Sequence, residues 1–476
     1  MKSNITFLLF FCIHSFLLGQ NLTIEAFEFV SRAKDTVQAE LGTFQVLEER
    51  SGEQTDSIQL SFVRFKSTNP NPASPIVYLS GGPGGSGTGT AKGRRFELFM
   101  KLRAVADVIA FDQRGTGMSE KLPVCPHNVA FELDRAIDKA EYVEKTTEGI
   151  SRCLEFWEQE QVNLTAYNTT ESAKDIDDLR RALGVDKISL WGISYGSHLA
   201  FEYIRLFEEH LDKVVLASLE GPNETVKLPI ETEKFVHQIA EKAKENYGSD
   251  VRYPNLKEKI IAVHDRVKKA PVTASYQNRS GGRDTVVMSL FELQAAIATF
   301  YLKNPWNSKK LPKAYSQMYE GDFSAVAPDV MVMKRYIFNG IRPMSFAMDM
   351  QGGISEERKA LVEQQIDNTI LGSCINFLLY EWMTKMDFPQ LADDFRTLPP
   401  NQVDALLLSG DLDGRTYLSD AINIAQQFEN GQHVVIENAG HDLFMSSPVV
   451  GDMILRFFQD KTLNIDRIRL SPTTFD

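Results

Sequence analysis

Residues 190–197, LWGISYGS, constrain the fold of this 476-residue chain more than any other segment. An apolar run leads directly into the pentapeptide GISYG at 192–196, and helical periodicity follows it. The two glycines of the pentapeptide lack a Cβ, so the chain can turn tightly around Ser194 and expose its hydroxyl. A strand, a sharp turn carrying serine and a helix are the context in which a G-x-S-x-G motif presents a nucleophile. The segment therefore predicts that Ser194 is a nucleophile at the edge of a sheet.

Short apolar runs alternate with helical stretches along most of the chain. The expected strands are Ile76–Leu79, Val105–Phe111, Lys187–Trp191, Lys213–Leu219, Ala405–Leu408 and His433–Ile436. Helices such as Ser172–Leu183 and Ser197–Phe207 separate most of them. This alternation indicates an α/β fold with a mostly parallel sheet flanked by helices. Upstream, Thr43–Glu48 and Ile58–Phe65 alternate apolar and polar residues and predict an antiparallel hairpin.

The alternation breaks between Pro229 and Pro400, where the periodicity is mostly helical. The expected helices there are Phe235–Glu245, Leu256–Val267, Leu290–Tyr301, Leu311–Tyr319 and Ser355–Thr369. We interpret residues 229–399 as a helical cap domain inserted between two parts of one core, residues 20–228 and 400–476. With 43% hydrophobic and 24% charged residues, the composition is that of a globular protein and excludes disordered and fibrous classes.

The first 20 residues, MKSNITFLLFFCIHSFLLGQ, have the features of a signal peptide. Lys2 supplies a positive charge, Ile5–Leu18 is apolar, and Gly19 is the small residue that a signal peptidase requires. The apolar stretch is shorter than the ~20 residues that span a bilayer. We therefore expect residues 1–19 to be a signal peptide and the protein to be exported, periplasmic or extracellular, without stable insertion in a membrane.

Removal of this leader takes away Cys12 and leaves Cys125, Cys153 and Cys374. In an oxidising compartment Cys125 and Cys153 can form a disulfide and leave Cys374 unpaired. The alternative is that all three are small buried thiols. Their spacing is not that of a zinc cluster, so no metal site is expected.

The charge balance of the chain bears on its partners. It has 51 Lys and Arg against 64 Asp and Glu, a formal net charge of −13. Nucleic acid is a polyanion, so an acidic chain is disfavoured as its partner. We interpret the short basic runs at 92–95 and 180–181 as solvated surface. Composition alone sets no oligomeric state.

A serine hydroxyl is a weak nucleophile until a base accepts its proton. Among eight histidines, His441 follows the apolar strand HVVIEN and so lies at a strand end, where an open α/β sheet carries its site. His198 lies one turn beyond Ser194 on the same helix, too constrained to approach the hydroxyl correctly. Two acids follow the strand ALLLSG, and either can orient the imidazole. We choose Asp413 because it lies deeper in the turn; Asp411 is then a turn-capping residue, and the reverse assignment stays open.

The glycine-rich segment IVYLSGGPGGSGTG, residues 76–89, begins in an early strand. It fits neither the G-x-x-x-x-G-K-[ST] nor the G-x-G-x-x-G phosphate-binding pattern. Gly82 can direct its N–H at a substrate carbonyl, whereas Pro83 has no N–H. The N–H of Tyr195, at the start of the helix after Ser194, supplies a second donor. We therefore predict an oxyanion hole formed by Gly82 and Tyr195.

Five motifs in this order carry a family resemblance: SGGPGGSG (80–87), DQRGTGMS (112–119), GISYG (192–196), SGDLDGRT (409–416) and NAGHD (438–442). Together they resemble the proline iminopeptidase and tripeptidyl aminopeptidase branch of the α/β-hydrolase family, over most of residues 40–220 and 400–450. The larger secreted members are most similar to this chain, in length and in the export signal. The resemblance implies an α/β-hydrolase fold with a helical cap and no cofactor.

The resemblance extends to single residues. The positions that match the family's functional residues are Ser194, Asp413 and His441 for the triad, and Gly82 and Tyr195 for the oxyanion hole. Asp112 and Arg114 match a structural turn, where we expect the two side chains to pair and brace the loops around the site. Ser80, Tyr417 and the lack of a cysteine in residues 347–352 depart from the family pattern. These departures leave the triad intact and concern the substrate pocket.

An aminopeptidase has to recognise a free amino terminus, for which a carboxylate is the charge-assisted partner. Glu220, at the end of an expected strand, is our candidate for substrate binding. Glu356, Glu357 and Glu381 in the cap are others, and a solvated surface position is the alternative for each.

Three functional hypotheses follow. The first is a secreted serine exopeptidase of the aminopeptidase type, which hydrolyses peptide substrates near a free N-terminus through an acyl-enzyme. The second is an esterase or another acyl hydrolase on the same scaffold, since fold and triad do not determine the substrate. The third is a non-catalytic binding protein with a relict site. The complete set of motifs argues against this hypothesis.

Overall fold

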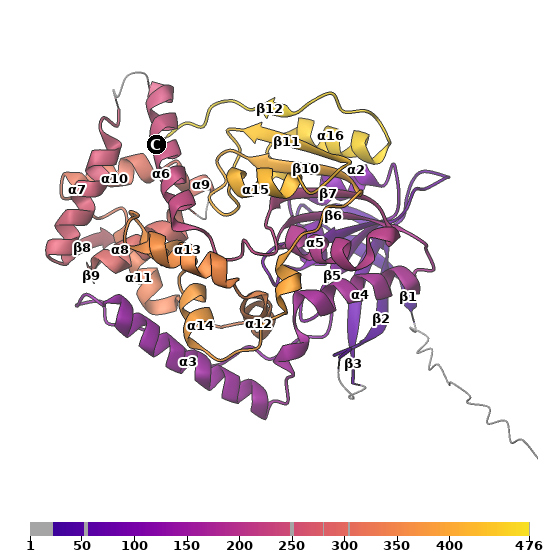
Figure 1. The fold of residues 1–476 in the computed structure, drawn as a ribbon, viewed down its shortest axis with the longest axis horizontal. Coiled ribbons are helices and arrows are strands. Elements are labelled where there is room, and N and C mark those ends of the chain that lie inside the picture. The colour runs from indigo at the N-terminus through magenta and orange to yellow at the C-terminus, as the bar shows by residue number, and fades with distance from the viewer. Residues whose placement is uncertain (1–21, 52–55, 248–251, 279, 303–304, 476) are drawn as a thin grey trace, which may run out of the picture.

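The computed structural model describes residues 22–51, 56–247, 252–278, 280–302 and 305–475, so the expected signal peptide at residues 1–19 lies outside the described residues. Its main sheet has ten strands. They are β1 (Thr23–Val30), β2 (Thr36–Leu47), β3 (Ser57–Phe65), β4 (Ile76–Leu79), β5 (Val108–Asp112), β6 (Ile188–Ser194), β7 (Leu211–Leu219), β10 (Asp404–Gly410), β11 (Gly431–Glu437) and β12 (Arg467–Arg469). A layer of helices lies beside the sheet (Figure 1).

The strand order is β1-β2-β3-β5-β4-β6-β7-β10-β11-β12. Strands β1, β2, β3 and β5 pair antiparallel, and from β5 to β12 every pairing is parallel. The predicted mostly parallel sheet is confirmed, and so is the hairpin, in which Phe44 lies opposite Leu60. Strand β1 was not anticipated, because this edge strand buries little beyond Phe29 and its apolar pattern is correspondingly weak.

Both faces of the sheet are buried, which explains its near-continuous apolar strands. Along β4, Ile76 and Tyr78 face one hydrophobic core, and Val77 and Leu79 face the other. The first core packs α2 (Phe96–Leu102) and α16 (Pro448–Phe458) against the sheet, and the second packs α4 (Thr169–Ala182), α5 (Tyr195–Phe207) and α15 (Leu418–Ala425). Helices thus flank the sheet on both sides, and the carboxyl ends of the parallel strands meet at one edge.

Residues 229–399 contain most of the remaining helices. They are α6 (Pro229–Tyr247), α7 (Leu256–Lys269), α8 (Leu290–Ala296), α9 (Pro305–Ser308), α10 (Leu311–Tyr319), α11 (Ala327–Tyr336), α12 (Pro343–Gly352), α13 (Glu356–Ile366) and α14 (Leu379–Lys385). The segment also holds an antiparallel hairpin of β8 (Val272–Gln277) and β9 (Arg283–Met288), which the mostly helical reading did not include. Both strands are short and carry β-branched residues, and their turn contains Gly281 and Gly282.

A long helix from the first part of the chain, α3 (Lys139–Gln159), joins this helical layer. The ring of Tyr142 lies 5.4 Å from that of Phe291 and 6.0 Å from that of Phe377, between centroids. Lys139 pairs with Glu381, with 2.7 Å between Nζ and Oε1. Figure 1 shows α3 along the lower margin of the layer, beside α14. The layer is therefore built from segments on both sides of Ser194 in the sequence.

Cys125 and Cys153 form a disulfide in the structure, with 5.4 Å between their Cα atoms. The bond ties the segment that follows β5 to α3. Cys374 is buried, and no cysteine in the described ranges is bonded to it. The structure therefore contains the first of the two cysteine arrangements that the sequence left open.

Replacing Cys125 or Cys153 by alanine is expected to destabilise the protein by about 3–4 kcal/mol. The bond closes a loop with a sequence separation of 28, so its loss frees the unfolded chain. Urea unfolding with and without reductant measures the effect. Reductant should lower the midpoint for the wild type and for the control Cys374→Ala, and should leave the midpoint of Cys153→Ala unchanged. An unchanged wild-type midpoint would contradict the prediction.

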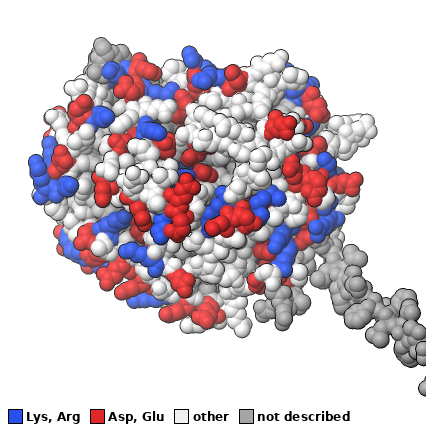
Figure 2. All heavy atoms as spheres, in the orientation of Figure 1, with Lys and Arg blue, Asp and Glu red and all other residues white. Residues whose placement is uncertain are grey.

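Two surface properties complete the description. Among the described residues, no helix combines the length and the apolar character needed to cross a bilayer. Figure 2 shows Lys and Arg interspersed with Asp and Glu over the face in view. Mixed charges of this kind produce no extended single-sign field over that face.

Candidate active site

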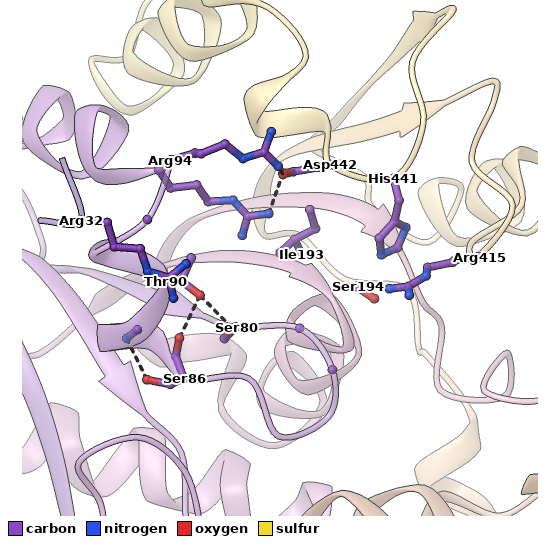
Figure 3. Close-up of a pocket in the computed structure, with 15 residues that line it drawn as sticks. Arg32, Ser80, Ser86, Thr90, Arg94, Ile193, Ser194, Arg415, His441 and Asp442 are labelled. Atoms are coloured by element: carbon purple, nitrogen blue, oxygen red, sulfur yellow. Dashed lines mark hydrogen bonds and ion pairs between the residues drawn. The ribbon is translucent and has the colours of Figure 1, made fainter. Parts of the chain in front are cut away.

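Ser194 occupies the sharp turn that its sequence context predicts. Strand β6 ends at Ser194 and α5 begins at Tyr195. Ser194 has φ 57° and ψ −128°, a conformation that is unfavourable for a residue with a side chain. The turn depends on close packing, because a Cβ at Gly196 would collide with the carbonyl oxygen of Leu79. The strained turn directs Ser194 into a pocket at the carboxyl edge of the sheet (Figure 3).

His441 and Asp413 come together from the ends of neighbouring strands. The Nδ1 atom of His441 lies 2.8 Å from Oδ2 and 3.0 Å from Oδ1 of Asp413. His441 lines the same pocket as Ser194, and Figure 3 shows the two side chains on the same side of it. A carboxylate can only accept, so Nδ1 carries the proton and the other ring nitrogen, Nε2, is the one available as a base.

Asp413 is buried and held in its charged form. Its carboxylate accepts hydrogen bonds from the Arg415 N–H at 2.9 Å, the Thr416 N–H at 3.1 Å and the Thr416 hydroxyl at 2.7 Å. Burial raises the pKa of Asp413, but His441 and these donors outweigh it and lower the pKa to about 2. The carboxylate is therefore ionised at neutral pH and can stabilise a protonated imidazole.

The alternative acid, Asp411, has other partners. Its Oδ1 accepts the N–H of Asn438 at 2.6 Å, and its Oδ2 pairs with Lys242 at 2.8 Å. These contacts connect the turn after β10 to the turn before His441 and to α6. The structure thus places Asp413, and not Asp411, against the imidazole.

Two further residues, Ser218 and Asp442, hold the loop of His441 through contacts that the sequence did not indicate. The hydroxyl of Ser218 donates to the carbonyl oxygen of His441 at 2.7 Å. Asp442 pairs with Arg95 at 2.6 Å and with Arg94 at 2.9 Å. Asp442 belongs to the NAGHD motif, but its partners lie almost 350 positions earlier and leave no local signal.

The proposed oxyanion donors lie next to Ser194. A Cβ at Gly81 would be 3.1 Å from the Cβ of Ser194, which shows how closely the glycine-rich loop approaches. Gly82 has φ +139°, a region that favours glycine, and it lines the same pocket as Ser194. The backbone N–H of Tyr195 is at the first turn of α5, where helix N–H groups are unpaired and favour negative charge.

The expected pairing of Asp112 with Arg114 is wrong. Asp112 accepts from the hydroxyl of Ser86 at 2.7 Å, from Thr88, and from the N–H of Met118 at 2.8 Å. Arg114 instead makes a bidentate pair with Asp175 on α4, at 2.7 and 2.8 Å. Both side chains are fully buried, so each needs a complete set of partners, and those come from different segments. Each still braces a loop near the site.

Ser194 lies between two pockets. One, of about 550 Å³, contains Ser194, His441 and several arginines (Figure 3). The other, of about 300 Å³, lies toward the helical layer and is lined by Gly82, Ser194, Glu220, Thr225, Lys227, Asp349, Ile375, Asn376, Phe377, Leu379, Gly414 and Arg415. Ser194 therefore contributes to the lining of both pockets.

Glu220 lines the smaller pocket, as a substrate-binding role requires. Its Oε1 accepts from Lys227 Nζ at 3.0 Å. Burial raises the pKa of Glu220, but the nearby positive charge of Lys227 and the two neighbouring histidines, His198 and His441, outweigh it, so the pKa falls below its usual value. Glu220 is thus a charged carboxylate beside Ser194. Asp349, on α12, lines the same pocket and was missed by sequence reasoning because it lies in a helix with no motif.

The other carboxylates suggested for the amino terminus lie elsewhere. Glu356 and Glu357 are exposed on α13, and Glu381 is buried against Lys139 and Ser373. None of the three lines either pocket beside Ser194. Within the described part of the chain, no group of three or more His, Cys, Asp and Glu is arranged to hold a metal ion.

Comparisons with known proteins show which family and which relatives the chain is similar to. Residues 74–448 match the family model described as alpha/beta hydrolase fold. The "Serine protease Hip1" of Mycobacterium bovis is 29% identical over 203 residues, 41% of this chain and 38% of the relative. The tripeptidyl aminopeptidase of Streptomyces lividans is 28% identical over 157 residues, 31% of this chain and 29% of the relative. A proline iminopeptidase of Xylella fastidiosa is 30% identical over 151 residues, 32% of this chain and 34% of the relative.

The chain therefore matches only between 29% and 38% of the length of these relatives. The family model, in contrast, covers most of the chain, from before the glycine-rich loop to beyond His441. The relatives that are named as peptidases, together with the match to the family model, support hydrolase activity for this chain. The chain belongs to the alpha/beta hydrolase fold family.

Proposed function

We propose that this protein is a serine exopeptidase of the aminopeptidase type, which hydrolyses peptide bonds near a free N-terminus. The observation that carries the proposal is the charged, largely buried Glu220 in a pocket shared with Ser194. An ionised carboxylate beside a nucleophile costs desolvation unless a cation or donor meets it, and a peptide's α-ammonium is such a group. The names of the relatives, tripeptidyl aminopeptidase and proline iminopeptidase, point the same way.

In the proposed reaction, Ser194 Oγ attacks the carbonyl carbon while Nε2 of His441 accepts the hydroxyl proton. Asp413 stabilises the resulting imidazolium through its contacts with Nδ1. The N–H groups of Gly82 and Tyr195 donate to the oxyanion. His441 then gives its proton to the leaving nitrogen, the C–N bond breaks and an acyl-enzyme remains. Water attacks this ester with the same base, which releases the acid product and restores Ser194.

Glu220 is suited to bind the substrate ammonium. Its Oε1 accepts from Lys227, whereas within the described residues nothing pairs with Oε2. Apolar side chains of Ile375, Phe377 and Leu379 line the same pocket and can contact the first side chains of a substrate. The smaller pocket therefore has a charged end that can bind the substrate's N-terminus and an apolar wall that can contact its side chains.

We also propose that the protein is exported. The leader-like residues 1–19 support this, and so does the disulfide between Cys125 and Cys153, because such bonds persist in oxidising compartments. Fractionation of cells expressing the full chain tests it, with an N-terminal sequence read from the exported form. Retention of the whole chain in the cytoplasm would contradict it.

A substrate panel tests the catalytic proposal. Aminoacyl and tripeptidyl 4-nitroanilides are compared with their N-acetylated forms and with short 4-nitrophenyl esters. We expect kcat/KM to be roughly 10- to 100-fold higher for the free amines, because acetylation removes a charged hydrogen bond. If the N-blocked esters are turned over far better than free peptides, the protein is an esterase and the proposal fails.

Replacing Glu220 by glutamine is expected to lower the free-to-acetylated ratio of kcat/KM by roughly 10-fold. The change removes the charge that meets the ammonium and nearly preserves the side-chain shape. Glu357→Gln, exposed on α13, is the matched control and should keep the wild-type ratio. Circular dichroism checks that both variants fold. A wild-type ratio in folded Glu220→Gln would show that the amino terminus binds elsewhere.

A further inference from the structure

We propose that the larger pocket beside Ser194 is a carboxylate-binding subsite for the leaving-group side of the substrate. This inference rests on the proposed function. It narrows the substrate class to peptides with a carboxylate close to the scissile bond on its C-terminal side, and foremost to short peptides with a free C-terminus.

The pocket is strongly positive within an acidic protein. Its lining carries Arg32, Arg94, Arg95 and Arg415, against the single acidic residue Asp442. The whole chain, in contrast, has a formal net charge of −13. The remaining lining residues are mostly glycines and small hydroxyl residues. Arg32, Arg94 and Arg415 are exposed in this pocket, whereas Arg95 is largely buried. The excess of positive charge is therefore a local property of this pocket.

The partners within the pocket do not balance the charge. Asp442 is shared by two guanidinium groups, at 2.9 Å from Arg94 and 2.6 Å from Arg95. Arg32 is exposed and makes no ion pair with any residue that the structure describes. Asp112 lies near the pocket behind Ser86, but its carboxylate is occupied by its own donors, including the Ser86 hydroxyl. A ligand carboxylate would meet the guanidinium group of Arg32 here, beside two arginines that share one carboxylate.

The position of the pocket relative to Ser194 assigns it to the leaving group. Gly82, Ser194 and Arg415 line both pockets, so the reacting carbonyl lies at their junction. With the substrate ammonium at Glu220 in the smaller pocket, the acyl part occupies that side. The leaving amine then extends into the larger pocket, where Figure 3 shows Arg32 and Arg94 across from Ser194 and His441.

The polarity of the two pockets matches that of a short peptide. A peptide has an ammonium at one end and a carboxylate at the other, and a guanidinium binds a carboxylate through paired hydrogen bonds. The pocket of about 550 Å³ is within the usual range for ligand sites. At about 3.3–3.6 Å per extended residue, a C-terminal carboxylate reaches the arginines only when few residues follow the scissile bond.

The test uses pairs of substrates with identical acyl parts. The first pair is a peptidyl 4-nitroanilide and the amide of 5-amino-2-nitrobenzoate, which carries an added ring carboxylate on the leaving group. The second pair is a short peptide with a free or an amidated C-terminus. A third pair, amidated peptides with Asp or Asn after the scissile bond, separates a side-chain carboxylate from the C-terminal one.

We expect the carboxylated member to be favoured about 10-fold in kcat/KM at low salt. The preference should shrink as salt rises, because these charges are solvent-accessible. Arg32→Gln should lower the carboxylated-to-neutral ratio by about threefold, and Arg32→Glu should lower it further. Arg152→Gln is the control. Arg152 is exposed on α3 with a side-chain exposure of 63%, and among the residues that the structure describes it pairs only with Glu148 in its own helix.

The outcomes separate this inference from the proposed function. If none of the peptides or anilides is cleaved, the proposed function fails. If both members of each pair are cleaved equally well, with no salt dependence of the ratio, the exopeptidase proposal stands and the subsite is refuted. An Arg32→Gln ratio equal to that of the wild type and of Arg152→Gln would likewise refute it.

Discussion

Replacing Ser194 by alanine is expected to lower kcat/KM by about 10⁵- to 10⁶-fold, because the nucleophile of a covalent mechanism is lost. Labelling by a fluorophosphonate, which forms a covalent bond with an activated serine, should disappear with it. The substitution removes one oxygen from the pocket, and an alanine Cβ occupies the space that the serine Cβ already fills. Folding should therefore be retained, and circular dichroism with a urea melt checks this.

Ser189→Ala is the matched control for this experiment. Ser189 lies on the same strand, β6, and is buried away from the pocket. It should label and turn over substrate as the wild type does. Labelling that persists in Ser194→Ala would show that a different residue is the nucleophile. A wild-type protein that neither labels nor hydrolyses any substrate would support a relict site.

Replacing Asp413 by asparagine is expected to lower kcat by about 10⁴-fold. The amide can accept the N–H groups of Arg415 and Thr416 through its oxygen and then turns its NH₂ toward His441. A donor at that position favours the imidazole tautomer with its proton on Nε2, which cannot accept a proton from Ser194. The substitution also removes the negative charge that stabilises the imidazolium.

Asp411→Asn is the comparison that makes this prediction specific. Asp411 pairs with Lys242 and accepts from the N–H of Asn438, and an asparagine can keep the second contact. We expect a loss of less than about 10-fold, because Asp411 does not contact His441 and one of its hydrogen bonds is retained. Single-turnover labelling and steady-state kinetics on both variants measure the difference. A larger loss in Asp411→Asn than in Asp413→Asn would reverse the roles of the two acids.

The elements that carry the site can be recognised from short segments. The turn at Ser194 needs only a strand, small flanking residues and a helix start, and all three lie within residues 188–207. Asp413 and His441 each follow a strand of the parallel sheet, and the carboxyl ends of such strands meet at one edge. Their positions directly after strand ends are therefore enough to predict that Ser194, Asp413 and His441 lie in a common region.

Partners between distant segments could not be predicted in the same way. Asp112 and Arg114 are two positions apart, yet their buried charges are met by Ser86 and Thr88 on one side and by Asp175 on the other. The hairpin of β8 and β9 was absorbed into the surrounding helical pattern, because two short strands carry little periodicity. The contacts of α3 with residues more than 140 positions later leave no trace in its own sequence.

The sequence by itself determined the α/β class, the parallel sheet and the residues able to act as nucleophile, base and acid. These properties depend on local periodicity and on motifs at strand ends, and both are determined by residues close together in the sequence. Only the tertiary structure decided that Asp413 rather than Asp411 contacts His441, and that Glu220 and Arg32 line two different pockets that share Ser194. These placements depend on how segments far apart in the sequence pack against one another, and such segments come together only when the whole chain has folded.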